Sequence, residues 1–246
     1  MVDLHAHVLP GVDDGPATLA DAVMMCRQAT ADGVDVIVAT AHQRTEEFLN
    51  DDLALLEQKR AELQNAVGDE PGILLGGEIR VDCGLLAEVD RLPGGTLLPL
   101  AGTRHLLIDF GFGELGPGPR EIVRELMLAG WVPVVAHPER LPYLADDIEL
   151  LRELVERGAL LQITAMGITG GFGRLVRDCC RLMIEESLVH LVASDAHDPR
   201  HRPPVLSEAY RAIAEEWGEE TARRLVVENP WSVIRQREPA EAGARQ

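Results

Sequence analysis

The chain has 246 residues, 46% of them hydrophobic, and a formal charge of −18 at pH 7. This length and apolar content suit one globular domain with a full core, and so acidic a surface excludes nucleic acid and anionic lipid as favoured partners. No run of about 18 apolar residues and no basic leader ahead of an apolar segment is present, so we expect no membrane span, no signal peptide and a cytoplasmic location.

Short apolar runs rich in Val, Ile and Leu alternate along the chain with stretches of helical periodicity. In chain order, the runs that predict strands are residues 2–7, 34–42, 72–78, 104–110, 131–137, 159–164 and 189–197. The stretches that predict helices are residues 19–31, 51–66, 119–129, 147–157, 174–186, 204–217 and 219–227. Continuous apolar strands that alternate with helices indicate a parallel sheet covered by helices.

Seven repeats of strand and helix predict an α/β fold over residues 1–236. We expect a distorted, closed or nearly closed (β/α)7 barrel, and an open doubly wound sheet is the alternative. Residues 237–246 are polar and rich in Ala and Gly, so we expect a disordered tail there.

Ionisable residues stand at the ends of six of the seven predicted strands, and the sixth strand ends in polar, uncharged residues instead. The C-terminal ends of parallel strands form one rim, where active sites lie. Imidazole and carboxylate groups gathered there are the usual ligands of Zn, Mn and Fe. With one aspartate from the first loop, nine candidate ligands suit two or three ions, and they are His5, His7, Asp14, His42, Glu78, Asp109, His137, Asp195 and His197.

The remaining histidines differ in their predicted positions. His105 and His190 begin strands at the opposite end of the barrel, so we expect them to be structural. His201 lies in the loop after the last strand, where exposure to solvent and contact with substrate both remain open.

Other catalytic patterns are absent or incomplete. None of the four cysteines begins a Cys-x5-Arg loop or a Cys-x-x-Cys pair, so we expect free thiols without function. Residues 111–116, GFGELG, fit the pattern GxGxxG, but Pro117 and Pro119 prevent the helix start that a dinucleotide fold requires. We interpret this segment as a flexible loop of the rim.

The stretches DLHAHVLPGVDDGP, ATAH, GGE, AHPER and SDAH, in this order, resemble the PHP superfamily of polymerase and histidinol phosphatase domains. The most similar branch is the bacterial PHP-type protein-tyrosine phosphatases of capsular and exopolysaccharide gene clusters, to which the loop HxLPGxDDGP is specific. The resemblance covers about residues 2–235. It implies three divalent ions at the barrel mouth, manganese first, with iron and zinc as alternatives.

The resemblance also implies how the ions are held. The first ion would take His5, His7, Glu78 and Asp195. Glu78 would bridge to a second ion, whose other ligands are His137 and the acid of the fourth strand. The third ion would take Asp14, His42 and His197. Arg140 and Arg202 match the arginines that bind phosphate in the family.

Three positions depart from the family pattern. Asp109 stands where the family has Glu, so its carboxylate is shorter by one C–C bond, and Glu114 in the next loop is the alternative ligand. Ala41 replaces a Pro, and Asp198 replaces an Asn that follows the SDAH motif. Asp198 adds negative charge near an anionic substrate.

The resemblance implies hydrolysis of phosphotyrosine, for example in the tail of a bacterial tyrosine kinase, by metal-activated hydroxide. Short insertions between the elements favour an open site that admits a peptide. One alternative is a PHP phosphatase acting on a small phosphoester such as histidinol phosphate, and another is a non-catalytic regulatory barrel that keeps its metal. The general acid is open between a metal-bound water and Asp198, and the sequence does not indicate an oligomeric state.

Overall fold

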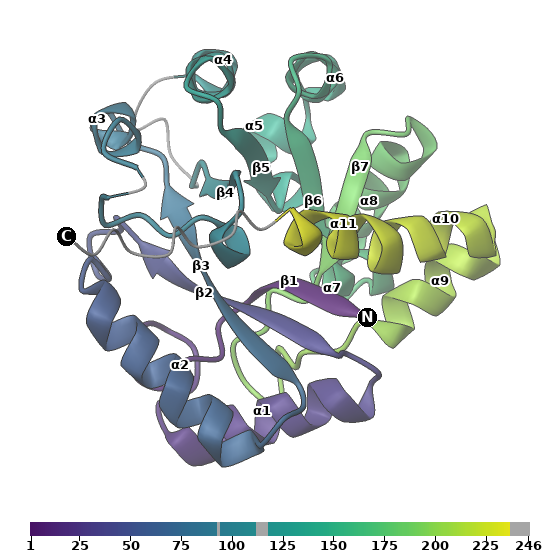
Figure 1. Ribbon diagram of the computed structural model, residues 1–246. Coiled ribbons are helices and arrows are strands. Elements are labelled where there is room, and N and C mark those ends of the chain that lie inside the picture. The colour runs from purple at the N-terminus through teal and green to yellow at the C-terminus, as the bar shows by residue number, and fades with distance from the viewer. Residues whose placement is uncertain (93, 112–117, 237–246) are drawn as a thin grey trace.

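The strands form one parallel sheet in the order β1-β2-β3-β4-β5-β6-β7 (Figure 1). The computed structural model describes residues 1–92, 94–111 and 118–236, so Glu114 and the predicted tail 237–246 lie outside the described residues. The strand bounds are β1 Val2–Ala6, β2 Val36–Gln43, β3 Gly72–Arg80, β4 His105–Asp109, β5 Val132–Ala136, β6 Leu160–Thr164 and β7 Val189–Ala193.

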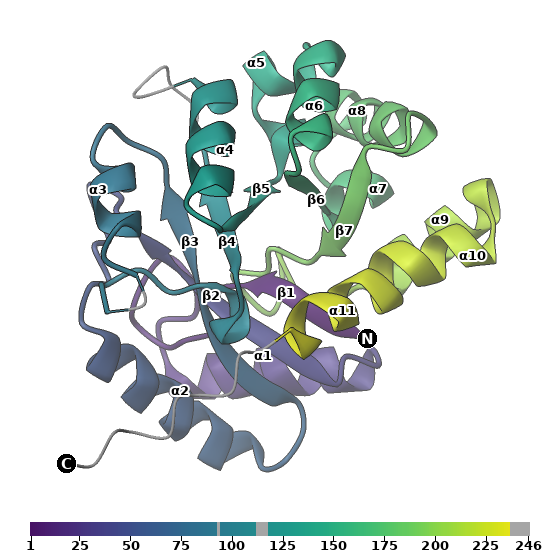
Figure 2. The same cartoon turned by 45° about the horizontal axis from the view of Figure 1, so that its top comes forward.

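Helices connect the strands and lie outside the sheet (Figures 1 and 2). The longer helices are α1 Leu19–Ala31, α2 Leu53–Val67, α4 Pro119–Leu128, α6 Ile148–Glu156, α8 Arg174–Glu185 and α9 Ser207–Trp217. The short ones are α3 Leu85–Val89, α5 Pro142–Ala145, α7 Ala165–Thr169, α10 Glu219–Arg223 and α11 Asn229–Arg235, with single turns at η1 Leu100–Gly102, η2 Pro138–Arg140 and η3 Arg224–Glu228. The predicted helices occur within a few residues of their expected bounds, whereas α3, α5, α7 and α11 were not predicted.

Local sequence signals explain where several helices begin and end. The Thr18 hydroxyl accepts a hydrogen bond from the backbone N–H of Asp21 and caps α1. The Asp147 carboxylate caps α6 in the same way. Gly130 and Gly158 follow α4 and α6 with φ of 84° and 100°, a conformation that glycine adopts without strain.

Direct contact between the first and last strands nearly closes the barrel. Just past the end of β7, the N–H of Asp195 donates to the His5 carbonyl, and the His7 N–H donates to the Ala196 carbonyl, both at 2.8 Å. The buried Asp3 carboxylate in β1 accepts hydrogen bonds from the N–H and the hydroxyl of Ser194. This closure confirms the (β/α)7 barrel and excludes the open doubly wound sheet.

One end of the barrel is filled with apolar side chains. Figures 1 and 2 show α11 beside the N-terminus of β1. Val233 and Ile234 of this helix join an inner core with strand residues that include Val2, Leu4, Val38, Leu107, Val134 and Leu191. Helix α11 therefore covers this end of the barrel.

The two-residue period of the strands places ionisable groups above this inner core. In β2 and β4 the core residues Val38 and Leu107 share a face with His42 and Asp109.

In β1 a bulge turns an ionisable side chain toward the barrel interior. Asp3 pairs with Ile37 and Ala6 with Ala39, so three steps along β1 match two along β2. The extra residue reverses the alternation of side chains, so that His5 faces the interior although Leu4 belongs to the inner core.

Candidate metal centre

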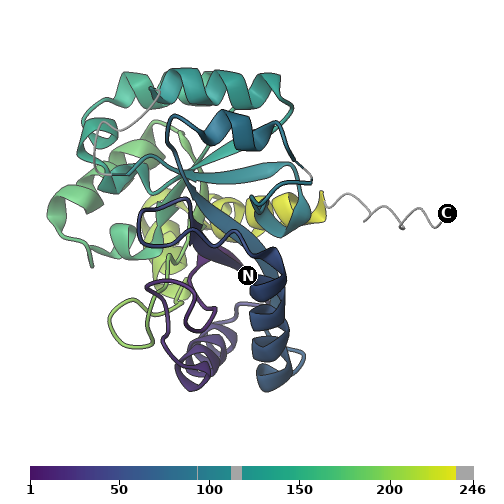
Figure 3. The same cartoon turned by 90° about the vertical axis from the view of Figure 1, so that its left-hand side faces the viewer.

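Most of the predicted ligands converge at the C-terminal ends of the strands. Figure 3 shows the loops that follow β1, β2 and β7 gathered on one side of the sheet. The side chains form three groups whose ligand atoms lie within 4.8 Å of one another. These groups are His7, Asp14, His42 and His197; His5, Glu78 and His137; and His5, His7 and Asp195. They contain eight of the nine predicted ligands, and Asp109 is in none of them.

His5 and His7 turn one ring nitrogen each toward the cluster. Their Nε2 atoms lie 3.3 Å apart. The Nδ1 of His5 donates to Gln162 Oε1, whose amide is oriented by its own bond to the Ile163 carbonyl, and the Nδ1 of His7 donates to Asp13 Oδ2, both at 2.8 Å. These partners fix the proton on Nδ1 and leave the Nε2 lone pairs free for a cation.

Glu78 lies at the centre of the cluster and is 1% exposed. One carboxylate oxygen is 2.8 Å from His137 Nε2, and the other is 2.6 Å from His42 Nδ1. That second oxygen and the buried Nδ1 of His137 make no aligned hydrogen bond within the part of the chain that the structure describes. Buried polar atoms are costly without partners, and a divalent cation would satisfy closely packed nitrogen and oxygen atoms of this kind. The residues therefore fit a metal site.

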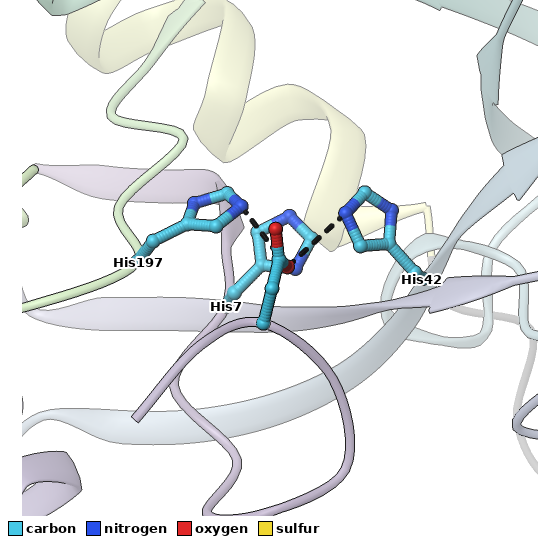
Figure 4. A group of neighbouring side chains, drawn as sticks. His7, His42 and His197 are labelled. Atoms are coloured by element: carbon cyan, nitrogen blue, oxygen red, sulfur yellow. Dashed lines mark ion pairs between the residues drawn. The ribbon is translucent and has the colours of Figure 1, made fainter. Parts of the chain in front are cut away.

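Asp14 completes the outermost group. Its Oδ1 atom lies 3.3 Å from the Nε2 atoms of both His42 and His197. Figure 4 shows the His42 and His197 rings on either side of His7, all facing one space. The loop that carries Asp14 packs tightly on β1, since a Cβ at Gly15 would lie 2.7 Å from the His7 carbonyl oxygen.

Two of the predicted ligands adopt left-handed backbone conformations. His137 has φ 34° and Asp195 has φ 52°, immediately beyond β5 and near the end of β7. Such conformations cost about 1–3 kcal/mol for residues other than glycine and are concentrated at functional sites. We infer that the barrel bears this strain because it aims both side chains at the cluster.

Mutual contacts dominate the titration of the cluster. Burial by itself lowers the pKa of His42 and His137, but their carboxylate neighbours more than offset this and raise each pKa to about 9. Burial raises the pKa of Glu78, but the positive histidines around it bring that pKa well below its usual range. Without an ion, protons on His42 and His137 balance the buried carboxylates, and a bound cation would displace those protons.

Arg140 and Arg202 both lie against the metal cluster. Arg140 Nη1 is 2.5 Å and Arg202 Nη2 is 2.6 Å from the same Asp195 oxygen. Both line a cavity of about 220 Å³ together with His42, Glu78 and His137. The Phe172 ring packs under the two guanidinium groups, with its centroid 4.6 Å from Arg140 Cζ and 5.7 Å from Arg202 Cζ. Phe172 was not predicted, because only the fold brings it to these arginines.

Asp109 lines the same cavity but is held by other partners. Its Oδ2 atom pairs with Arg80 Nη2 at 2.9 Å, and its Oδ1 atom accepts from the Gly111 N–H at 2.8 Å. Gly111 has φ 68°, a conformation that glycine adopts without strain, and a Cβ there would lie 1.6 Å from Arg80 Nη1, so a side chain would displace this guanidinium group. Arg80, also unpredicted, adds a third guanidinium to the cavity. Binding of metal by Asp109 stays a prediction.

The other candidates lie apart from the cluster. His105 and His190 stand at the starts of β4 and β7, as expected, and the His201 side chain is 86% exposed. The Asp198 carboxylate accepts hydrogen bonds from the N–H groups of Arg200 and His201, so it stabilises its own loop.

Two of the cysteines, Cys26 and Cys179, are unsuited to act as nucleophiles. All four are free, and burial raises the pKa of Cys26 and of Cys179 to about 12. At neutral pH these two thiols hold their protons, and a protonated thiol is a weak nucleophile.

Comparisons with known proteins agree with this geometry. A family model described as capsular polysaccharide synthesis, CpsB/CapC, matches residues 1–235. The tyrosine-protein phosphatase YwqE of Bacillus subtilis is 34% identical over 89% of this chain and 86% of its own. The putative tyrosine-protein phosphatase CapC of Staphylococcus aureus is 34% identical over 85% of this chain and 82% of its own.

Solved structures also resemble this chain. A structure from a study of YwqE from Bacillus subtilis and CpsB from Streptococcus pneumoniae, described as unique metal-dependent tyrosine phosphatases, superposes with a TM-score of 0.89. It shares 33% identity and covers 97% of this chain and 96% of its own. An organophosphorus hydrolase variant, 15% identical with a TM-score of 0.56 over 95% of this chain and 92% of its own, shares the fold. The chain belongs to the CpsB/CapC family of capsular polysaccharide synthesis.

Proposed function

We propose that this chain is a metal-dependent phosphatase that hydrolyses phosphotyrosine in proteins. The observation that carries the proposal is one cavity whose walls combine a buried histidine–carboxylate cluster with Arg140 and Arg202. The cluster suits divalent ions, and guanidinium groups bind phosphate oxygens in pairs. Relatives named as tyrosine-protein phosphatases support the same activity.

We further propose that the cluster holds three ions, with manganese as the first candidate and iron or zinc as alternatives. The three groups of close ligand atoms support this number. His5, His7, Glu78 and Asp195 would hold the first ion, Glu78 and His137 with Asp109 the second, and Asp14, His42 and His197 the third. Bound divalent ions would supply a nucleophile from water at neutral pH and would stabilise negative charge on phosphoryl oxygens.

The residues of the chain would do the remaining work. Arg140 and Arg202, now paired with Asp195, would bind the phosphoryl oxygens and stabilise their charge in the transition state. Phe172 would hold both guanidinium groups in place. Because the pKa of a free tyrosine is about 10, tyrosinate leaves with little help from an acid. No acid is therefore required from Asp198, whose carboxylate already binds its own loop.

The specific partner in this proposal is the phosphotyrosine tail of a bacterial tyrosine kinase.

No helix of the described residues is long and apolar enough to cross a membrane. The cytoplasmic location remains a prediction, which cell fractionation tests.

One experiment separates this function from its alternatives. The metal content of the purified chain is measured, and hydrolysis of a phosphotyrosine peptide and of histidinol phosphate is assayed side by side. We expect about three ions per chain and preferred hydrolysis of the phosphotyrosine peptide. Preference for histidinol phosphate would indicate that the substrate is a small phosphoester and not phosphotyrosine in proteins. Full metal content without turnover of either compound would indicate a non-catalytic barrel.

A further inference from the structure

A second cavity adjoins the metal cavity. Its volume is about 600 Å³, against about 220 Å³ for the metal cavity. The two share the walls made by Asp14, His42 and Arg80, so a group bound at the ions can extend directly into the larger space. Phe48 and Phe110 supply aromatic surface to the larger cavity.

Phe48 lies at the boundary between the two cavities. Its ring is parallel to the imidazole of His42, with 10° between the planes and 6.1 Å between the centroids. His42 belongs to the histidine–carboxylate cluster, so the Phe48 ring presents an apolar surface next to that cluster. Phe48 is partly exposed and belongs to neither apolar core of the described residues, so packing of the barrel does not account for its position.

The loop that carries Phe48 is ordered by its own hydrogen bonds. The Thr45 hydroxyl accepts from the Phe48 N–H at 2.8 Å, and the Thr45 N–H donates to the Phe48 carbonyl at 3.1 Å. The Asn50 amide donates to the carbonyls of His42 and Val12, which ties the loop to β2 and to the loop after β1. The ring is therefore positioned before a substrate arrives, so binding need not supply that ordering.

We propose that this second cavity is the subsite for the phenyl ring of phosphotyrosine, and that Phe48 selects aryl phosphates over alkyl phosphates. The inference rests on the phosphatase function proposed above. Only the ester oxygen separates the phosphorus of phosphotyrosine from its ring, so a phosphate at the metal cluster places the ring at the shared wall. Aromatic pairs stabilise a complex by about 0.5–1.5 kcal/mol beyond the area they bury. An alkyl chain does not make that contact.

The test compares Phe48→Leu with Phe48→Tyr on two substrates, phenyl phosphate and glycerol phosphate. Phe48→Leu is expected to reduce kcat/KM for phenyl phosphate about 3- to 10-fold, the size of one aromatic contact, and to leave glycerol phosphate unchanged. The loss should appear in KM and not in kcat, because stacking stabilises the bound substrate and the transition state alike. Phe48→Tyr keeps the ring and should behave as the parent. Leu49→Ala changes an exposed neighbour outside the cavity and is the matched control.

Metal content is measured on every variant. An equal loss on both substrates, or loss of metal in Phe48→Leu, would show that the ring only supports His42 and would overturn the inference while the phosphatase function stands. Unchanged selectivity in Phe48→Leu would overturn it as well. A parent protein that hydrolyses neither phenyl phosphate nor the phosphotyrosine peptide would contradict the proposed function itself, and the subsite with it.

Discussion

Two pairs of largely buried histidines, one pair at each end of the barrel, occupy opposite electrostatic environments. At the C-terminal ends of the strands, His42 and His137 contact Glu78, and each has a pKa raised to about 9. At the N-terminal ends, burial lowers the pKa of His105 to about 4 and also lowers that of His190. The Nδ1 atom of His105 is hydrogen-bonded to the Thr103 hydroxyl, which is uncharged.

The difference shows that burial alone does not identify a functional histidine. Both sets are largely buried, and burial lowers the pKa in both. Only the C-terminal set also collects buried carboxylates, which makes it a site for positive charge that a proton or a metal ion can fill. Changes at the C-terminal end of the barrel should therefore affect metal binding and activity, whereas changes at the N-terminal end should affect only stability.

Removal of metal is expected to have the largest effect and to act only at the C-terminal end. Dialysis against a chelator should abolish hydrolysis of phosphotyrosine, and added Mn²⁺ should restore it. Alkylation of the cysteines should leave turnover intact, because the nucleophile comes from water. Inactivation by alkylation, with metal and fold retained, would contradict the mechanism.

Substitution of the ligands should have nearly the same effect. His5→Ala and Glu78→Ala are expected to lower metal content and to abolish turnover while circular dichroism shows a folded chain, and Glu78→Gln is the near-isosteric variant should Ala unfold it. His105→Gln is the control at the other end and should keep both metal and activity. Parent-level turnover in either ligand variant would rule out the cluster as the active centre.

The arginines should affect turnover without affecting metal. Arg140→Ala and Arg202→Ala are each expected to reduce kcat/KM by about 10²–10³-fold with full metal occupancy, the scale of removing one preorganised group that stabilises charge. Lys at either position should recover only part of the loss, because an ammonium group lacks the two-pronged geometry. If both Ala variants match the parent on phosphotyrosine, phosphate binds elsewhere.

Substitution of His105 at the N-terminal end should change only the stability of the folded chain in acid. The folded-state pKa of His105, about 4, lies below the unfolded value of 6.5, so its contribution is complete above pH 6.5 and is lost as pH falls toward 4. Between pH 7 and pH 4.5 the parent should lose about 2 kcal/mol more free energy of unfolding than His105→Gln does. Chemical denaturation at both pH values measures this, and an equal loss in both proteins would refute the assignment.

The sequence predicted which side chains converge at the strand ends better than the contacts that surround them. His5 and His7 could be paired from strand periodicity, and ligands such as Glu78 stood out as ionisable ends of apolar runs. The bulge in β1, which turns His5 inward beside Leu4, leaves no local signal because it depends on pairing with β2.

Residues that tertiary packing brings to the site were also not predicted, because their contacts leave no local signal in the sequence. Phe172, between α7 and α8, meets Arg140 of η2 only in the folded chain, and Arg80 packs beside Gly111 in the loop after β4. Helix α11 was not predicted because it is short and follows η3 without a break, and its role comes from covering the inner core. Asp109 was predicted as a ligand from its place at a strand end and from the family resemblance, and the structure adds Arg80 as its partner.

The most direct test is an anomalous difference map from crystals grown with MnCl₂. Peaks are expected among the side chains of the cluster, with one between Glu78 and His137, one beside His5 and His7, and one between Asp14 and His197. No peak is expected at His105 or His190. A map without peaks in the cluster, from crystals of a preparation that hydrolyses phosphotyrosine, would contradict the claim that metal at the strand ends performs the reaction.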